Sequence, residues 1–311
     1  MNHRTGRSRS PLQRRLALLR HRAQRLDPTV KGLLWVTLAG LIFVQLNTII
    51  RLLSLQMHPL QAQFLRYISS VIVMAPWVMG AGLAAYMPKR MGGQFVRGGL
   101  HSVGLMLWFT ALPQIPMADT TAIGFTGPIF IMLGAYLFFR EQMRWDRWLA
   151  ALLGFVGVLI VLGPSLTGGS SVYSLVMLAS SPIFAASFLL TKALTRTERV
   201  EVIVLWQAIS VSLFSLPLAI WFWAPVLPGQ WLGFLAAGVL GVAAHYSVTR
   251  GFAVADISST QSVKFLDLVW AAAMGWLVFG ETPSQTTLIG GLVICGATIW
   301  IARREARGRQ R

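Results

Sequence analysis

Apolar segments long enough to cross a lipid bilayer recur along the whole chain. A membrane-spanning helix needs about 20 mostly apolar residues, and charged residues, prolines and glycine clusters separate ten such segments here. They cover residues 31–53, 61–83, 95–113, 119–139, 146–164, 172–193, 200–224, 230–250, 257–279 and 284–302. Only 12% of the 311 residues are charged, about half the share of a soluble domain. The sequence therefore predicts an all-α membrane protein with ten transmembrane helices.

Lysine and arginine are distributed unevenly around these segments. Of the 27 basic residues, 24 lie in the two tails and in alternate segments that connect the spans and include their ends (84–97, 140–147, 192–201 and 250–256), whereas the segments between these hold only Arg51. Cytoplasmic loops carry such an excess of positive charge. We therefore expect both termini in the cytoplasm and an even number of crossings. The net charge of +17 favours contact of the tails with anionic lipid over binding of nucleic acid.

The two halves of the chain resemble each other. Residues 111–141 align with residues 251–281 at a shift of 140 positions, which brings Glu141 opposite Glu281. Each half holds five predicted helices, and an odd number makes the second half enter the membrane from the opposite side. The sequence thus predicts two inverted five-helix repeats. This architecture is typical of secondary carriers, whose substrate site lies near the bilayer midplane between the repeats.

The stretches LPQIPMADTTAIGFTGPIFIMLGAYLFFRE and HYSVTRGFAVADISSTQSVKFLDLVWAAAMGWLVFGE resemble the two EamA domains of the drug/metabolite transporter (DMT) superfamily. Arg66, in QFLRYISS, also resembles the family pattern of the second helix. The resemblance covers about residues 31–302. Together with the predicted spans it divides the chain into a basic cytoplasmic tail (1–30), a first repeat (31–164), a second repeat (165–302) and a second basic tail (303–311).

The resemblance implies a secondary transporter that moves a small organic metabolite by alternating access across the bacterial inner membrane. Many relatives are exporters, so we expect export of an amino-acid-derived metabolite, such as an amino acid or an opine-type metallophore. A proton or another solute would be the counter-ion. The alternative is uptake of a vitamin-like solute such as riboflavin or S-adenosylmethionine. Deletion of the gene would distinguish the two directions by where the metabolite accumulates.

Other classes of membrane protein lack support in the sequence. We find no His-Glu-x-x-His, Gly-x-Ser-x-Gly or Walker motif and no repeated filter-like segment, which argues against an intramembrane enzyme, an ATP-driven pump and a channel. The single cysteine, Cys295, gives no disulfide or cysteine-based metal site. We expect no cofactor or metal. The glycine-rich last span of each half either packs within the chain or forms a homodimer surface.

Ionisable residues inside the predicted spans are the first candidates for the substrate site, because they are costly in lipid and normally face a cavity or a partner. Lys264 and Asp267 are three residues apart and so share a helix face. They form either a structural ion pair or part of the substrate path. Arg66 either meets an anionic group or extends to the lipid headgroups. Glu141 and Glu281 are expected to cap the next helix or to bind a nearby arginine.

Histidines and aromatic residues complete the candidate site. His101 and His245 lie in equivalent spans of the two repeats, and a neutral imidazole can both donate and accept a hydrogen bond. The competing interpretation is a hydrogen bond that packs two helices. The other candidates are Tyr246, Trp108, Phe125, Phe265 and Trp270. A cavity with aromatic walls and few charges would suit a flat or partly apolar solute.

Overall fold

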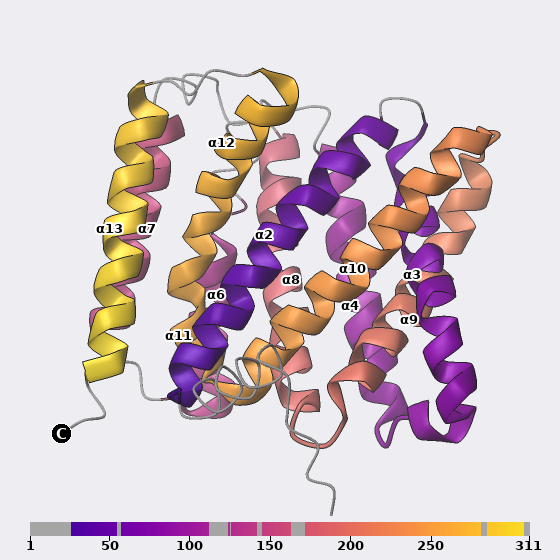
Figure 1. Ribbon diagram of the computed structural model, residues 1–311, viewed down its shortest axis with the longest axis horizontal. Helices are drawn as coiled ribbons and strands as arrows, with labels where there is room; N and C mark the ends of the chain where they lie inside the picture. The colour runs from indigo at the N-terminus through magenta and orange to yellow at the C-terminus, as the bar shows by residue number, and fades with distance from the viewer. Residues whose placement is uncertain are drawn as a thin grey trace, which may run out of the picture.

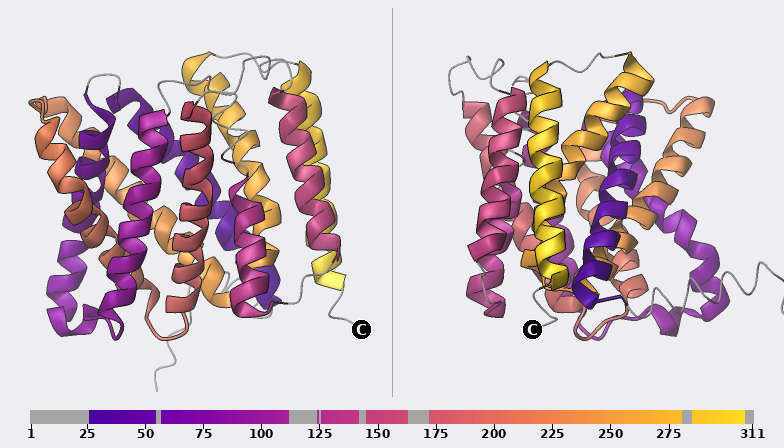
Figure 2. Two further views of the ribbon diagram at one scale, coloured as in Figure 1. Left: turned by 180° about the vertical axis from the view of Figure 1, so that it is seen from behind. Right: turned by 60° about the vertical axis from the view of Figure 1, so that its left-hand side comes forward.

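The molecule is a bundle of helices that run between two opposite ends (Figures 1 and 2). The computed structural model describes residues 26–54, 57–111, 124, 126–141, 145–162, 172–280 and 285–307. Its longer helices are α2 (Pro28–Ser54), α3 (Pro59–Ala81), α4 (Met91–Ala111), α6 (Gly127–Phe139), α7 (Trp145–Leu162), α8 (Val172–Leu194), α9 (Val200–Trp221), α10 (Pro228–Val254), α12 (Leu266–Phe279) and α13 (Gln285–Arg307). The short helices are η1 (Leu83–Tyr86), α11 (Ile257–Thr260) and η4 (Gln261–Phe265). Within these described ranges the fold is all-α.

One end of the bundle carries most of the positive charge of the connecting segments. The start of α2 and the end of α13 both lie there (Figure 1). The connections at this end include residues 87–90, 140–141 and 195–199, with the basic residues Lys89, Arg90, Arg140, Arg196 and Arg199. We refer to it as the basic end, and to the other as the opposite end.

Local signals in the sequence explain where α2 and α10 begin. Asp27 precedes α2, and its carboxylate accepts the N–H of Thr29 at 2.7 Å. Pro228 occupies the first turn of α10, and the Gln230 side chain accepts the N–H of Leu227 at 2.8 Å. Each contact satisfies an N–H group that has no partner within the helix.

The longer helices overlap the ten predicted spans, although most of them begin or end a few residues outside the predicted bounds. Two differences are larger. α6 begins at Gly127 although the prediction began at residue 119, and residues 112–123 and 125 lie outside the described ranges. The ninth span is divided into α11, η4 and α12. By length and hydropathy, five helices in the described ranges qualify individually as membrane-crossing: α2, α3, α8, α9 and α10.

Arg97 is a further difference from the sequence analysis, which counted it with the basic residues of the cytoplasmic segment 84–97. It lies in the second turn of α4 and is 1% exposed. Its guanidinium donates to Thr191 Oγ1 at 2.6 Å and to the Ile203 carbonyl at 2.8 Å, and it also contacts the Gln207 side chain. These neutral acceptors on α8 and α9 allow the arginine to be buried.

Helix pairing reveals the relation between the two halves. α2 packs against α10, and the equivalent pair α8 and α4 packs in the same way. The contacts of α10 with α3 and of α12 with α2 are likewise matched by those of α4 with α9 and of α6 with α8. α3 pairs with its own counterpart α9, and α7 with α13. The fold is therefore that of two inverted repeats that pack mainly against each other.

Close helix contacts and helix-ending turns also recur in the two repeats at positions 140 residues apart. Gly98 and Gly238 are 140 residues apart, and a Cβ at either would collide with Ser210 of α9 or Ser69 of α3, respectively. Arg140 and Gly280 end the equivalent helices α6 and α12, and both have a left-handed backbone, with φ of 52° and 66°. The internal similarity is therefore also present in the backbone geometry.

Candidate functional site

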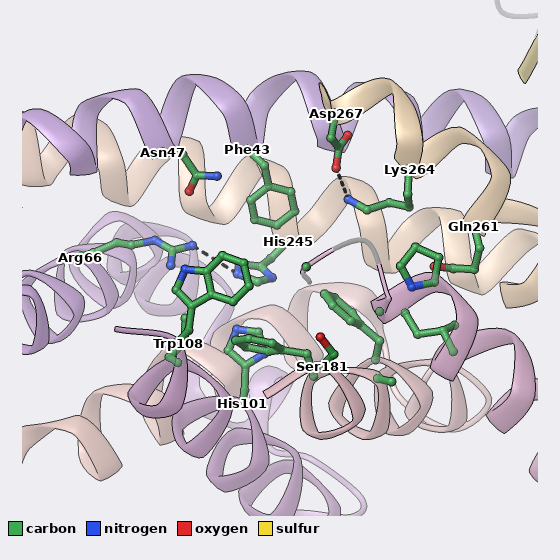
Figure 3. Close-up of a pocket in the computed structure, with 18 residues that line it drawn as sticks. Phe43, Asn47, Arg66, His101, Trp108, Ser181, His245, Gln261, Lys264 and Asp267 are labelled. Carbon is green, nitrogen blue, oxygen red and sulfur yellow. Dashed lines mark hydrogen bonds and ion pairs between the residues drawn. The ribbon is translucent and has the colours of Figure 1, made fainter. Parts of the chain in front are cut away.

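A cavity of about 330 Å³ lies between helices of both halves (Figure 3). The residues that line it are Phe43, Asn47, Arg66, His101, Leu105, Trp108, Gly124, Gly127, Pro128, Ile131, Ser181, Phe184, Ala185, Phe188, His245, Gln261, Lys264 and Asp267. Because α2, α3, α4 and α6 come from the first repeat and α8, α10, η4 and α12 from the second, a solute here would contact both repeats. A site between repeats is the expected place for the substrate of a carrier.

Lys264 and Asp267 form an ion pair at the cavity wall. Lys264 Nζ lies 2.6 Å from Asp267 Oδ2, and each side chain is about one quarter exposed, at 26% and 25%. Gly40 of α2 leaves the space that the carboxylate occupies, because a Cβ at this position would collide with Asp267. The pair is thus neutral as a unit and is held against α2.

A second cluster of polar side chains surrounds His245 on the other side of the cavity. Arg66 Nη2 lies 3.5 Å and the Tyr67 hydroxyl 3.4 Å from His245 Nε2. The Arg66 guanidinium also lies 4.5 Å from the centre of the Tyr67 ring, a cation–π arrangement. Among the described residues, no carboxylate pairs with Arg66, and its Nε is buried without a hydrogen-bond partner. Arg66 therefore retains donor capacity and positive charge beside the cavity.

The two histidines, which come from equivalent helices, approach each other here. The rings of His101 and His245 are 5.8 Å apart at 77°, and His101 Nδ1 lies 3.4 Å from Ser187 Oγ. Both side chains are buried in the structure. The sequence placed the histidines in corresponding spans, and the fold brings them to one wall.

Aromatic rings form much of the remaining wall. Phe184 lies edge-on to His101 at 5.3 Å and to Trp108 at 6.4 Å. Phe43 lies edge-on to His245 at 5.2 Å. Figure 3 shows Trp108 and Phe43 on the same cavity as Arg66. The cavity thus combines apolar ring surfaces with a few polar groups, as small-molecule sites commonly do.

Three of the predicted site residues lie away from this cavity. Tyr246 packs edge-on against Trp35 at 6.2 Å. Phe265 is fully buried in a core cluster and fills the space beside Gly154 of α7. Trp270 is on α12 but does not line the cavity. Phe125 lies outside the described residues.

Neutral residues at the cavity were missed by the sequence analysis. Asn47, Ser181 and Gln261 line it, and each is a polar residue within an apolar span. That signal was available, but a small polar side chain in a transmembrane helix also commonly serves helix packing. Sequence alone does not reveal which of the two roles it has.

The fold and the cavity define a multi-pass membrane protein built of two inverted repeats. The sequence matches the EamA-like transporter family at residues 30–163 and again at residues 171–303. The chain belongs to this family, which is part of the DMT superfamily.

Three relatives illustrate what this chain is similar to. A riboflavin transporter of Rhizobium johnstonii is 33% identical over 89% of this chain and 93% of its own length. An S-adenosylmethionine uptake transporter of Rickettsia prowazekii is 25% identical, covering 89% and 94%. The pseudopaline exporter CntI of Pseudomonas aeruginosa is 26% identical, covering 90% and 99%. The class of this protein is therefore that of small-molecule transporters.

Proposed function

We propose that this protein is an alternating-access carrier that takes up a flat, vitamin-like solute across the bacterial inner membrane, with riboflavin as the first candidate. Its basic end would face the cytoplasm, in accordance with the charge distribution of the loops. The uptake alternative of the sequence analysis thus becomes the preferred interpretation. Support comes from the riboflavin transporter of R. johnstonii, at 33% identity, and from the chemistry of the cavity.

The observation that carries this proposal is a guanidinium that has no carboxylate partner among the described residues and lies beside aromatic walls. Riboflavin has a planar ring system whose dione edge is rich in hydrogen-bond acceptors, and Arg66 offers donors without a carboxylate partner among the described residues. Trp108, Phe184 and Phe43 offer ring surfaces of the kind against which a planar solute packs. Because Lys264 and Asp267 neutralise each other, this part of the cavity does not require a strongly charged cargo.

Export of an amino-acid-derived metabolite is the second candidate. The similarity to a pseudopaline exporter favours it, and so does Arg66, because a guanidinium also binds a carboxylate well. This is the export direction that the sequence analysis preferred.

Counterflow in proteoliposomes distinguishes the two candidates. Vesicles containing the purified protein are preloaded with unlabelled riboflavin, and entry of labelled riboflavin is followed against empty vesicles. We expect saturable entry that increases with internal riboflavin and leaves the solute chemically unchanged. The uptake direction predicts that the gene restores growth of a riboflavin auxotroph at low external riboflavin.

Counterflow of an amino-acid-derived solute without counterflow of riboflavin would replace the first candidate by the second. Chemical conversion of the solute, or flux without stimulation from the far side, would contradict the carrier mechanism altogether.

A further inference from the structure

A packed layer separates the cavity from the basic end. Ile131 and Ala185 line the cavity and also belong to a buried hydrophobic cluster that includes Leu189 and Ile257. Phe139 also packs against this cluster. It lines a second, polar hollow of about 490 Å³ at the basic end. A solute that moves from one hollow to the other must open this layer.

Glu141, which lines the hollow at the basic end, joins the end of α6 to the start of the ninth span. Its Oε1 accepts the N–H of Ile257 and its Oε2 the N–H of Ser258, both at 3.1 Å. The Ser258 hydroxyl also donates to Oε2, at 2.5 Å. Glu141 was expected to cap the next helix or to bind an arginine. Instead it caps α11, which is 116 residues further along the chain and belongs to the other repeat.

Two cationic side chains, from α7 and α8, also bind the junction between α10 and α11. Arg147 of α7 donates to Ser258 Oγ at 3.0 Å and lies 3.6 Å from the carboxylate of Asp256. Lys192 of α8 donates to the carbonyls of Phe252 and Ala255, at 2.7 and 2.6 Å. The end of α10 and the start of α11 are therefore attached to α6, α7 and α8 by charged groups.

The segment that Glu141 caps also reaches the cavity. α11 continues directly into the 3₁₀ helix η4, which carries Gln261 and Lys264 into the cavity wall. A short 3₁₀ segment within a longer helix often marks a hinge, because its hydrogen bonding is weaker. A solute contact at Lys264 and the Glu141 cap thus lie on one continuous segment of Ile257–Phe265.

We propose that Glu141 is a positioning residue that keeps the basic end closed by holding the start of α11. Solute binding moves η4, and this movement breaks the contact between Glu141 and α11, here called the lock. The lock joins the two repeats, so its release opens the layer between the cavity and the hollow at the basic end. This inference depends on the proposed carrier mechanism, but it does not depend on the identity of the cargo.

Thiol accessibility tests the lock without a cargo. In a Cys295→Ala background, Ser181→Cys places one thiol at the cavity wall, and a membrane-impermeant maleimide is added at either face of oriented vesicles. Glu141→Gln removes the charge from the cap. We expect labelling from the basic end to become about tenfold faster, as expected from loss of charge-assisted hydrogen bonds.

Glu198→Gln is the matched control. Glu198 accepts the N–H of Arg90 at 2.8 Å at the same end of the bundle, but no contact with α10 or α11 is among its described interactions. Its labelling rate should equal that of the parent protein. Equal rates in Glu141→Gln and the parent, or equal increases in both variants, would overturn the inference.

Ser258→Ala provides a second variant in case Glu141→Gln does not fold. It removes one hydroxyl from the network and leaves the backbone N–H contacts to Glu141 intact, so we expect a smaller increase of about threefold. No increase in a folded Ser258→Ala protein would also contradict the lock. Riboflavin counterflow, measured separately, distinguishes failure of the lock from failure of the proposed cargo.

Discussion

At the scale of single residues, the contact between Gly40 and Asp267 links the cavity to helix packing. The carboxylate of Asp267 occupies the space that a side chain at position 40 would need, and it pairs with Lys264 at 2.6 Å. The orientation of the ion pair therefore depends on the absence of a side chain at position 40 of α2.

We expect Gly40→Ala to displace Asp267 and to lower transport to the level of Asp267→Asn. Overpacking of this kind costs about 1–3 kcal/mol of stability, which a shift of the melting temperature would register. Gly291→Ala on α13 is the control, because a Cβ there meets nothing within 4 Å. Normal transport by Gly40→Ala would show that the pair does not need this position.

Arg66 is the second residue for which the site makes a sharp prediction. If it donates to the cargo, Arg66→Gln should raise the KM for riboflavin about tenfold, as expected for loss of a hydrogen bond from a charged donor. Arg66→Lys should give an intermediate value, because an ammonium keeps the charge without the planar fork of donors. Arg199→Gln is a suitable control, since Arg199 is 62% exposed beside Glu201. An unchanged KM in Arg66→Gln would remove Arg66 from the site.

Charge in an apolar span was the most informative residue signal. It led to Arg66, Lys264 and Asp267, all of which line the cavity. The aromatic signal was weaker, because rings fill cores as readily as cavities, as Phe265 does against Gly154. The importance of Glu141 for the other repeat was not predictable, since its partners lie 116 and 117 residues away.

At the scale of elements, the turns that end α6 and α12 are equivalent but differ in their residue. Arg140 has a φ of 52°, where a side chain is unfavourable, and Gly280 has a φ of 66°. We expect Arg140→Gly to raise and Gly280→Ala to lower the stability of the purified protein, each by about 1 kcal/mol. Thermal unfolding in detergent measures both changes. A loss of stability in Arg140→Gly would mean that the arginine side chain contributes more than the backbone costs.

The helices could be predicted more completely than their interruptions. Apolar length alone located spans that overlap each of the longer helices, because a bilayer requires about 20 apolar residues. It did not reveal the change to a 3₁₀ helix at Gln261–Phe265, since hydropathy does not report hydrogen-bond register. The count of cytoplasmic basic residues included Arg97, whose burial depends on acceptors from α8 and α9.

At the scale of the whole molecule, most of the packing joins one repeat to the other. α2 packs on α10, α4 on α8, α3 on α9 and α7 on α13. We therefore expect residues 1–164 and 165–311, expressed as separate chains, to give transport only when they are produced together. Each half alone should aggregate or be degraded, because its packing surfaces are unpartnered. Either half alone forming a stable, active protein would contradict this dependence.

The central claim is that the two repeats alternate around the cavity, and distances across both ends test it most directly. Spin labels at Arg140 and Ala253 report on the basic end, and labels at Trp276 of α12 and Thr110 of α4 report on the equivalent pair of helices at the opposite end. Pulsed spectroscopy in proteoliposomes, with and without riboflavin, gives both distance distributions. We predict two populations of distances for each pair of labels. Addition of cargo should lengthen the distance at one end and shorten the distance at the other. A single distance at the basic end, unchanged by a cargo that is being carried, would contradict the account.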